Sequence, residues 1–94
     1  MALEKKSKQP QDVIDYPVDY SEWLAERPGY EIDTYTVTVE TGIDLVTHLQ
    51  IGPVITVFLG GGTTGTTYKV TVRATMTPTP LIKEFDFLVQ VREL

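Results

Sequence analysis

The stretch Leu59–Met76, LGGGTTGTTYKVTVRATM, decides the fold class. After a turn rich in glycine and threonine, the even positions from 68 to 76 are Tyr, Val, Val, Ala and Met, and the odd positions from 69 to 75 are Lys, Thr, Arg and Thr. This period of two predicts a β-strand with one buried and one exposed face. A tyrosine that begins such a strand directly after a turn is typical of the tyrosine corner of a β-sandwich, in which the hydroxyl bonds to nearby main chain.

Further strand patterns lie on both sides of this stretch. Pro17 removes a main-chain donor and indicates an edge strand, and the segment 21–26, SEWLAE, predicts one helical turn capped by Ser21. Turn residues recur about every 8 to 12 positions, as in an all-β sandwich. We therefore predict an immunoglobulin-like or fibronectin III-like β-sandwich of six or seven strands with one short helical turn, in which the other strands cover residues 13–18, 32–40, 44–51, 54–59 and 81–91.

The domain boundary is expected near residue 11. The leader MALEKKSKQPQ is charged and polar, and we interpret residues 1–11 as a flexible N-terminal arm that could become ordered on assembly. Residues 12–94 have the length of a single β-sandwich domain.

The segment Val54–Leu59 differs from the other strands because nearly every residue in it is apolar. Such a run indicates either a strand that is covered on both sides or one whose outer face lies in an interface.

Composition excludes several classes of protein. The chain has no cysteine, so disulfides and thiolate metal sites are excluded. The net charge is −5 and acids dominate between Asp12 and Asp44, so we expect no nucleic-acid partner. No apolar run approaches the ~20 residues that a bilayer requires, and no secretory signal is recognised. We therefore expect no membrane insertion and no export of the chain by itself.

Candidate catalytic or ligand-binding groups are few. His48 has no partner at a defined spacing, and the spacing of Asp12, Asp15 and Asp19 matches no known calcium loop. Gly60–Gly62 lacks the Gly-Lys-Ser/Thr ending of a phosphate-binding loop and is expected to supply positive φ angles in a turn. No Ser–His–Asp or Cys–His set can be assembled. We predict no catalytic, metal-binding or cofactor-binding residue, and no enzyme activity.

The aromatic residues Tyr16, Tyr20 and Trp23 surround the predicted helical turn. They could form an interface hot spot, since Trp and Tyr are enriched at such spots. Alternatively they plug one end of the sandwich, with the indole N–H bonded to main chain. The plug is the preferred interpretation.

Two segments together carry a resemblance to a known family. Residues 12–24, DVIDYPVDYSEWL, and residues 57–68, VFLGGGTTGTTY, resemble short proteins encoded by tailed bacteriophages and prophages. The likeness covers residues 10 to about 91. Such proteins are described as virion-associated or fibre–tail adaptor proteins with an immunoglobulin-like sandwich. The second half alone also looks like a fibronectin type III repeat.

The resemblance implies a structural, non-enzymatic adaptor of a phage or prophage particle, associated with the tail or its fibres. Its partners would be other virion and tail proteins, with a homo-oligomer possible, and it would be located in the virion, after assembly in the host cytoplasm. No partner-contact residue can be carried over. The alternatives are a free-standing module that binds protein or carbohydrate through exposed aromatic residues such as Tyr30, Tyr35 or Phe58, and a small enzyme or metal protein.

Overall fold

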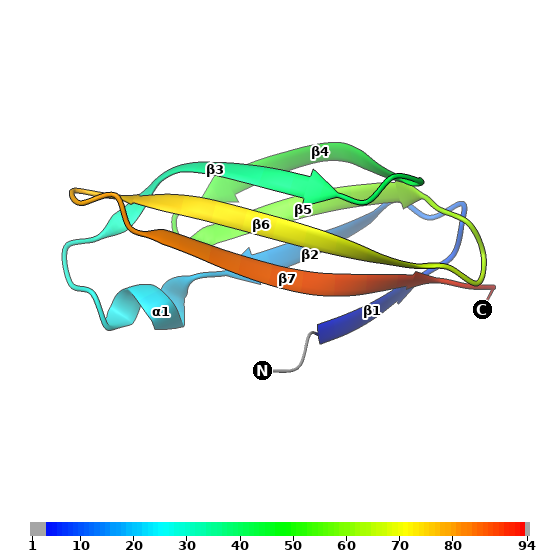
Figure 1. Ribbon diagram of the computed structural model, residues 1–94, viewed down its shortest axis with the longest axis horizontal. Coiled ribbons are helices and arrows are strands. Elements are labelled where there is room, and N and C mark those ends of the chain that lie inside the picture. The colour runs from blue at the N-terminus through cyan, green and yellow to red at the C-terminus, as the bar shows by residue number, and fades with distance from the viewer. Residues whose placement is uncertain (1–3, 94) are drawn as a thin grey trace.

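The structure, a computed structural model that describes residues 4–93, is a sandwich of two β-sheets (Figure 1). The predicted all-β class is confirmed. In chain order its elements are β1 (Glu4–Lys8), β2 (Ile14–Asp19), α1 (Ser21–Ala25), β3 (Glu31–Val39), β4 (Ile43–Ile51), β5 (Val54–Gly61), β6 (Thr67–Thr77) and β7 (Ile82–Val91).

One sheet has four strands in the order β1-β7-β6-β3, and the other has three strands in the order β2-β5-β4. If β2 to β7 are equated with strands B to G, these are the B-E-D and C-F-G groupings of an immunoglobulin sandwich. The order supports the immunoglobulin-like identity, which stays a prediction. Strand β2 is an edge strand, as Pro17 indicated, and Pro17 pairs with Thr56 of β5.

The core lies between the two sheets and follows the period of two. Alternate residues of β5 and β6 point inward, so that the side chains of Val57, Leu59, Val70 and Val72 have no exposed surface. Burial of one such side chain contributes about 1.5–3 kcal/mol. The other core residues are Tyr16, Tyr20, Ile32, Ile43, Ile55, Tyr68, Ala74, Met76, Phe87, Val89 and Val91.

Strand β1 corrects the prediction of a flexible arm over residues 1–11, of which residues 1–3 lie outside the described part of the chain. Residues 4–8 pair in parallel with β7, from Glu4 opposite Phe87 to Lys8 opposite Val91. The side chain of Lys8 is buried, and its ammonium donates hydrogen bonds to the carbonyls of Gln9 (2.6 Å) and Gly61 (2.5 Å). The charged sequence indicated a solvated arm. The unpaired edge of β7, however, offers main-chain hydrogen-bond partners to an extended segment, and the lysine side chains do not prevent this pairing.

The helical turn is present as predicted, but Ser21 does not cap it with its own side chain. The Asp19 carboxylate instead accepts a hydrogen bond from the Ser21 main-chain N–H at 2.8 Å, and another from the Ser21 hydroxyl. These bonds hold the pKa of Asp19 below its usual range. An aspartate before the helix thus takes the role assigned to the serine, because its acceptor oxygens are charged.

Candidate interaction surface

The outer face of the four-stranded sheet is polar. Its central strand β6 turns Lys69, Thr71, Arg73 and Thr75 outward, opposite the buried row that includes Val70 and Val72. Lys69 lies 3.7 Å from Asp86, and Arg73 lies 3.8 Å from Glu84, both across the β6–β7 pairing. The charges on this face are therefore balanced within the face itself.

The outer face of the three-stranded sheet is largely apolar, although Thr47 and Thr56 also point outward on it. Strand β5 turns Ile55, Val57 and Leu59 into the core, and by alternation its Val54 and Phe58 point outward, where both remain half-buried. From the neighbouring β4, Leu49 pairs with Thr56 and Ile51 pairs with Val54, so both also point outward. Of the two alternatives for residues 54–59, a strand covered on both sides does not agree with the structure, because no other element of residues 4–93 covers the outer side of β5. The alternative of an outer face in an interface stays a prediction.

A β-bulge adds to this apolar surface. The β4–β5 register shifts between Leu45 and Thr47, which leaves Val46 as the extra residue. A Cβ placed on Gly60 would lie 3.2 Å from Val46 Cγ2 and 3.4 Å from Val13 Cγ2. The side chains of Val13 and Val46 thus both lie over Gly60, which is buried although its position in β5 belongs to the outer face.

We call the side chains of Val13, Val46, Leu49, Ile51, Val54 and Phe58 the apolar face. The described residues include five large hydrophobic side chains that are exposed, and four of them belong to the apolar face: Val13 (59%), Val46 (54%), Leu49 (40%) and Ile51 (73%). The fifth, Ile82 (51%), lies on β7 in the other sheet. A cluster of this kind, unlike a single exposed apolar residue, marks an interaction surface.

The charged residues on the strands of the apolar face are acids, and the buried Lys8 of β1 interacts electrostatically with one of them, Asp44. Strands β2, β4 and β5 carry Asp15, Asp19 and Asp44 and contain no Lys or Arg. None of the three aspartates forms an ion pair with another of residues 4–93. The three-stranded sheet is therefore an apolar surface with an acidic border.

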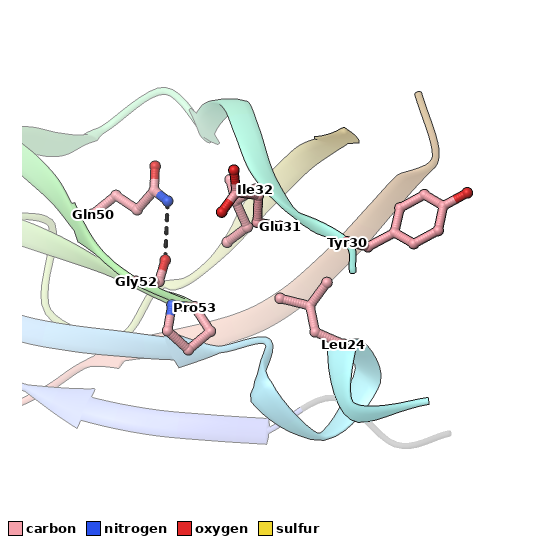
Figure 2. A pocket seen from close by; sticks show the side chains of 7 residues that line it. All are labelled: Leu24, Tyr30, Glu31, Ile32, Gln50, Gly52 and Pro53. Atoms are coloured by element: carbon pink, nitrogen blue, oxygen red, sulfur yellow. Dashed lines mark hydrogen bonds between the residues drawn. The ribbon is translucent and has the colours of Figure 1, made fainter. Parts of the chain in front are cut away.

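A hollow of about 260 Å³ lies at the end of the sandwich where α1, the start of β3 and the β4–β5 turn meet (Figure 2). Leu24 and Pro53 contribute apolar surface, the Gln50 amide donates to the Gly52 carbonyl at 2.9 Å, and the Tyr30 ring points away from them. The hollow is smaller than typical small-molecule sites, and Glu31 is its one titratable carboxylate. It offers room for one apolar side chain of a partner rather than a catalytic arrangement.

The aromatic residues around α1 separate into different roles. Tyr20 has no exposed surface, its hydroxyl lies 3.1 Å from the carbonyls of Val72 and Lys83, and its ring meets Phe85 edge-on at 4.7 Å. Burial raises the pKa of Tyr20. Of the three aromatic residues predicted to plug this end through the Trp23 indole, it is Tyr20 that lies fully buried and bonds to main chain. Trp23 is only half-buried, and the Arg27 guanidinium lies 4.0 Å above its ring.

The tyrosine corner is present at the start of β6. Tyr68 is buried, and its hydroxyl accepts a hydrogen bond from the main-chain N–H of Thr63 at 3.0 Å. Hydrogen bonds from Thr63 lower the pKa of Tyr68. Gly61, Gly62 and Gly65 adopt φ of +69°, +93° and +90°, which confirms the expected role of these glycines, whereas Gly60 does not have a positive φ.

The remaining candidate residues are not brought together. His48 is exposed on β4, and its Nδ1 lies 2.8 Å from the Tyr35 hydroxyl. Asp12 accepts from the main-chain N–H of Gln9, and Asp19 accepts from Ser21. Within residues 4–93 no group of three or more His, Cys, Asp or Glu side chains could hold a metal ion, and no helix is long and apolar enough to cross a membrane.

Comparison with known protein families decides the relationship of this chain. Residues 8–90 match the family described as Podophage GP4 fiber-tail adaptor protein gp77. The chain belongs to this family. The match covers most of the sequence and confirms the phage fibre–tail adaptor resemblance and the structural phage adaptor role that it implied. No curated protein matches the chain.

Proposed function

We propose that this member of the adaptor family is a non-enzymatic component of the virion that attaches to other tail or fibre proteins through the surface of its β-sandwich. Family membership over residues 8–90 carries the proposal. The apolar face supports it, since a solvent-exposed apolar cluster is stable in an assembled particle once a partner covers it. Assembly in the host cytoplasm belongs to the same proposal.

The test begins with the phage or prophage that encodes the chain. The gene is disrupted, particles are purified and their fibres are examined by electron microscopy and host adsorption. We expect particles without the chain to have fewer attached fibres, and expression of the unmodified gene during infection to restore both the chain and the fibres. Particles that contain no trace of the chain after infection with the intact gene would contradict a virion role.

The free-standing binding module is less well supported. It requires an aromatic platform exposed on the monomer, but Tyr30, Tyr35 and Phe58 are all half-buried. They also lie on different parts of the sandwich: before β3, on β3 and on β5. The Tyr35 hydroxyl already forms a hydrogen bond with the His48 ring.

A further inference from the structure

We infer that the apolar face is the docking surface for a different virion protein, one whose contact surface is an apolar patch bordered by Lys or Arg side chains. This inference rests on the proposed function and adds to it which face docks and what the partner's surface is made of. Two observations carry it: the apolar side chains are clustered, and the charged residues on the same strands are acids.

The side chains themselves indicate an interface rather than a second core. A strand in a two-layer sandwich needs one apolar side to fold, and β5 already buries Ile55, Val57 and Leu59 completely. Outward apolar residues at Leu49, Ile51 and Phe58 add nothing to that core, and they favour aggregation unless a partner covers them. Docking to a partner explains why these positions carry apolar side chains that would otherwise favour aggregation.

The charges select the partner. Asp15 pairs with Phe58 in register, and Asp44 pairs with Gly60, so carboxylates flank β5 on both sides. No base on β2, β4 or β5 neutralises them, and the buried Lys8 of β1 interacts with Asp44 but not with Asp15. A second copy docked by the same face would bring these carboxylates together in a desolvated interface, where like charges oppose binding. A surface bordered by Lys or Arg would pair with them.

The size of the apolar face indicates what kind of contact it can make. Eight residues of β5 at ~3.3 Å each span about 26 Å, and three strands at ~4.8 Å span about 14 Å, which gives a projected area on the order of 400 Å². A standard stable interface buries roughly 800 Å² on each partner. A face of this size suits a contact made within an assembly that holds both partners together.

The experiment measures binding to purified particles from an infection in which the gene for this chain is disrupted. The chain has no cysteine, so Thr79→Cys in the exposed β6–β7 connection provides a single labelling position for a fluorophore. Labelled protein is titrated against the particles and bound protein is measured by cosedimentation. Unlabelled variants then compete with it, and each competing variant is first checked for an unchanged melting temperature.

The decisive variants are Ile51→Lys and Ile51→Glu, with Ile82→Lys and Ile82→Glu as matched controls. Both positions are exposed isoleucines, at 73% and 51%, but they lie on opposite sheets. We expect Ile51→Lys to weaken competition roughly tenfold or more, Ile51→Glu to weaken it less, and both Ile82 variants to compete like the unmodified protein. Asp15→Asn should reduce the salt dependence of binding.

Each other outcome has a defined meaning. If the unmodified chain does not bind the particles, the proposed function fails. If it binds but both Ile51 variants compete normally, the function stands and the docking face is wrong. If Ile51→Glu is as harmful as Ile51→Lys, the partner's border is not basic. A dimer seen by sedimentation and abolished by Ile51→Lys would make a second copy the occupant and overturn the inference.

Discussion

The outer faces of the two sheets are built on the same strand geometry but have opposite chemistry. On the four-stranded sheet, threonines alternate with charged residues that pair across strands, as in Lys69–Asp86 and Arg73–Glu84. On the three-stranded sheet, Leu49, Ile51 and Phe58 are apolar and the bordering aspartates have no ion-pair partner within residues 4–93. Folding requires apolar residues on the inner face of each sheet, whereas it sets no such requirement on the outer face. The residues of the outer face can therefore be suited to whatever the sheet contacts.

The largest effect on stability is expected at the edge of the four-stranded sheet, where Lys8 anchors β1. Lys8→Met keeps the buried stem and removes the ammonium, so the carbonyls of Gln9 and Gly61 lose a charged donor. We expect the free energy of unfolding to fall by about 2–3 kcal/mol, measured by urea denaturation.

The control for this variant is Lys6→Met on the same strand. The Lys6 ammonium pairs with Glu4 at the surface, and such a pair contributes about 0–1 kcal/mol. Equal, small effects of the two substitutions would mean that β1 does not stabilise the sheet, and the four-stranded sheet would then be a three-stranded one in solution.

The next effect concerns the link between the two sheets. Tyr20 follows β2 of the three-stranded sheet, and its hydroxyl reaches the carbonyls of Val72 and Lys83 in the four-stranded sheet. Tyr20→Phe removes the hydroxyl, whose single hydrogen lies between the two carbonyl acceptors, and should cost about 1–2 kcal/mol in urea denaturation.

Tyr16→Phe is the matched variant. The Tyr16 hydroxyl is buried and has no hydrogen-bond partner among residues 4–93, so its removal should leave stability unchanged or raise it slightly. If Tyr16→Phe were the more damaging of the two, the sheets would be joined at Tyr16 and not at Tyr20.

The same link predicts a pH dependence. Burial raises the pKa of Tyr20, so the native phenol keeps its proton at pH values where the unfolded phenol, with its ordinary pKa near 10, has lost it. The contribution of Tyr20 is therefore complete below pH 10 and is lost as the pH rises above 10. The stability advantage of the unmodified protein over Tyr20→Phe should shrink between pH 9 and pH 11, and a constant difference would contradict the burial of a protonated phenol.

The smallest effect on stability is expected when the apolar face is made to resemble the other face. The double variant Leu49→Thr, Ile51→Thr places threonines on exposed positions of β4, where surface changes usually alter stability by less than about 0.5 kcal/mol. Its retention on a hydrophobic column should fall clearly below that of Ile82→Thr. A loss above about 1 kcal/mol would show that these side chains serve folding, and the contrast between the faces would lose its functional meaning.

Much of the architecture could be predicted because alternation along a strand is a local property. The period of two from Tyr68 to Met76 specified β6, and Pro17 placed β2 at an edge. Strand β1 could not be found this way, since EKKSK has no apolar alternation and its place depends on main-chain pairing with a strand about eighty residues away. The hydrogen bond from the Ser21 main-chain N–H to Asp19 could not be predicted for a related reason. Several side-chain oxygens near the start of α1 can accept from this N–H, and the backbone geometry decides which of them does.

The candidate surface was only partly visible in the sequence. The apolar run at Val54–Leu59 left open whether a second layer covers β5 or an interface does. The structure decided between them by pairing β5 with β2 and β4, which gathers Val13, Val46 and Leu49 on the same outer side. Of the six residues of the apolar face, only Val54 and Phe58 lie within the run 54–59 that the sequence pattern indicated.

The sequence by itself determined the all-β class, the turns, the corner at Tyr68 and, through a recognisable pattern, the phage adaptor family. These depend on residues that are close together in the chain. Only the tertiary structure decided that β1 joins the sheet and that apolar side chains of β4 and β5 share one outer face, with aspartates on both sides of β5. Both depend on which distant strands become neighbours, and the free energy that selects those neighbours comes from burial summed over the whole sandwich.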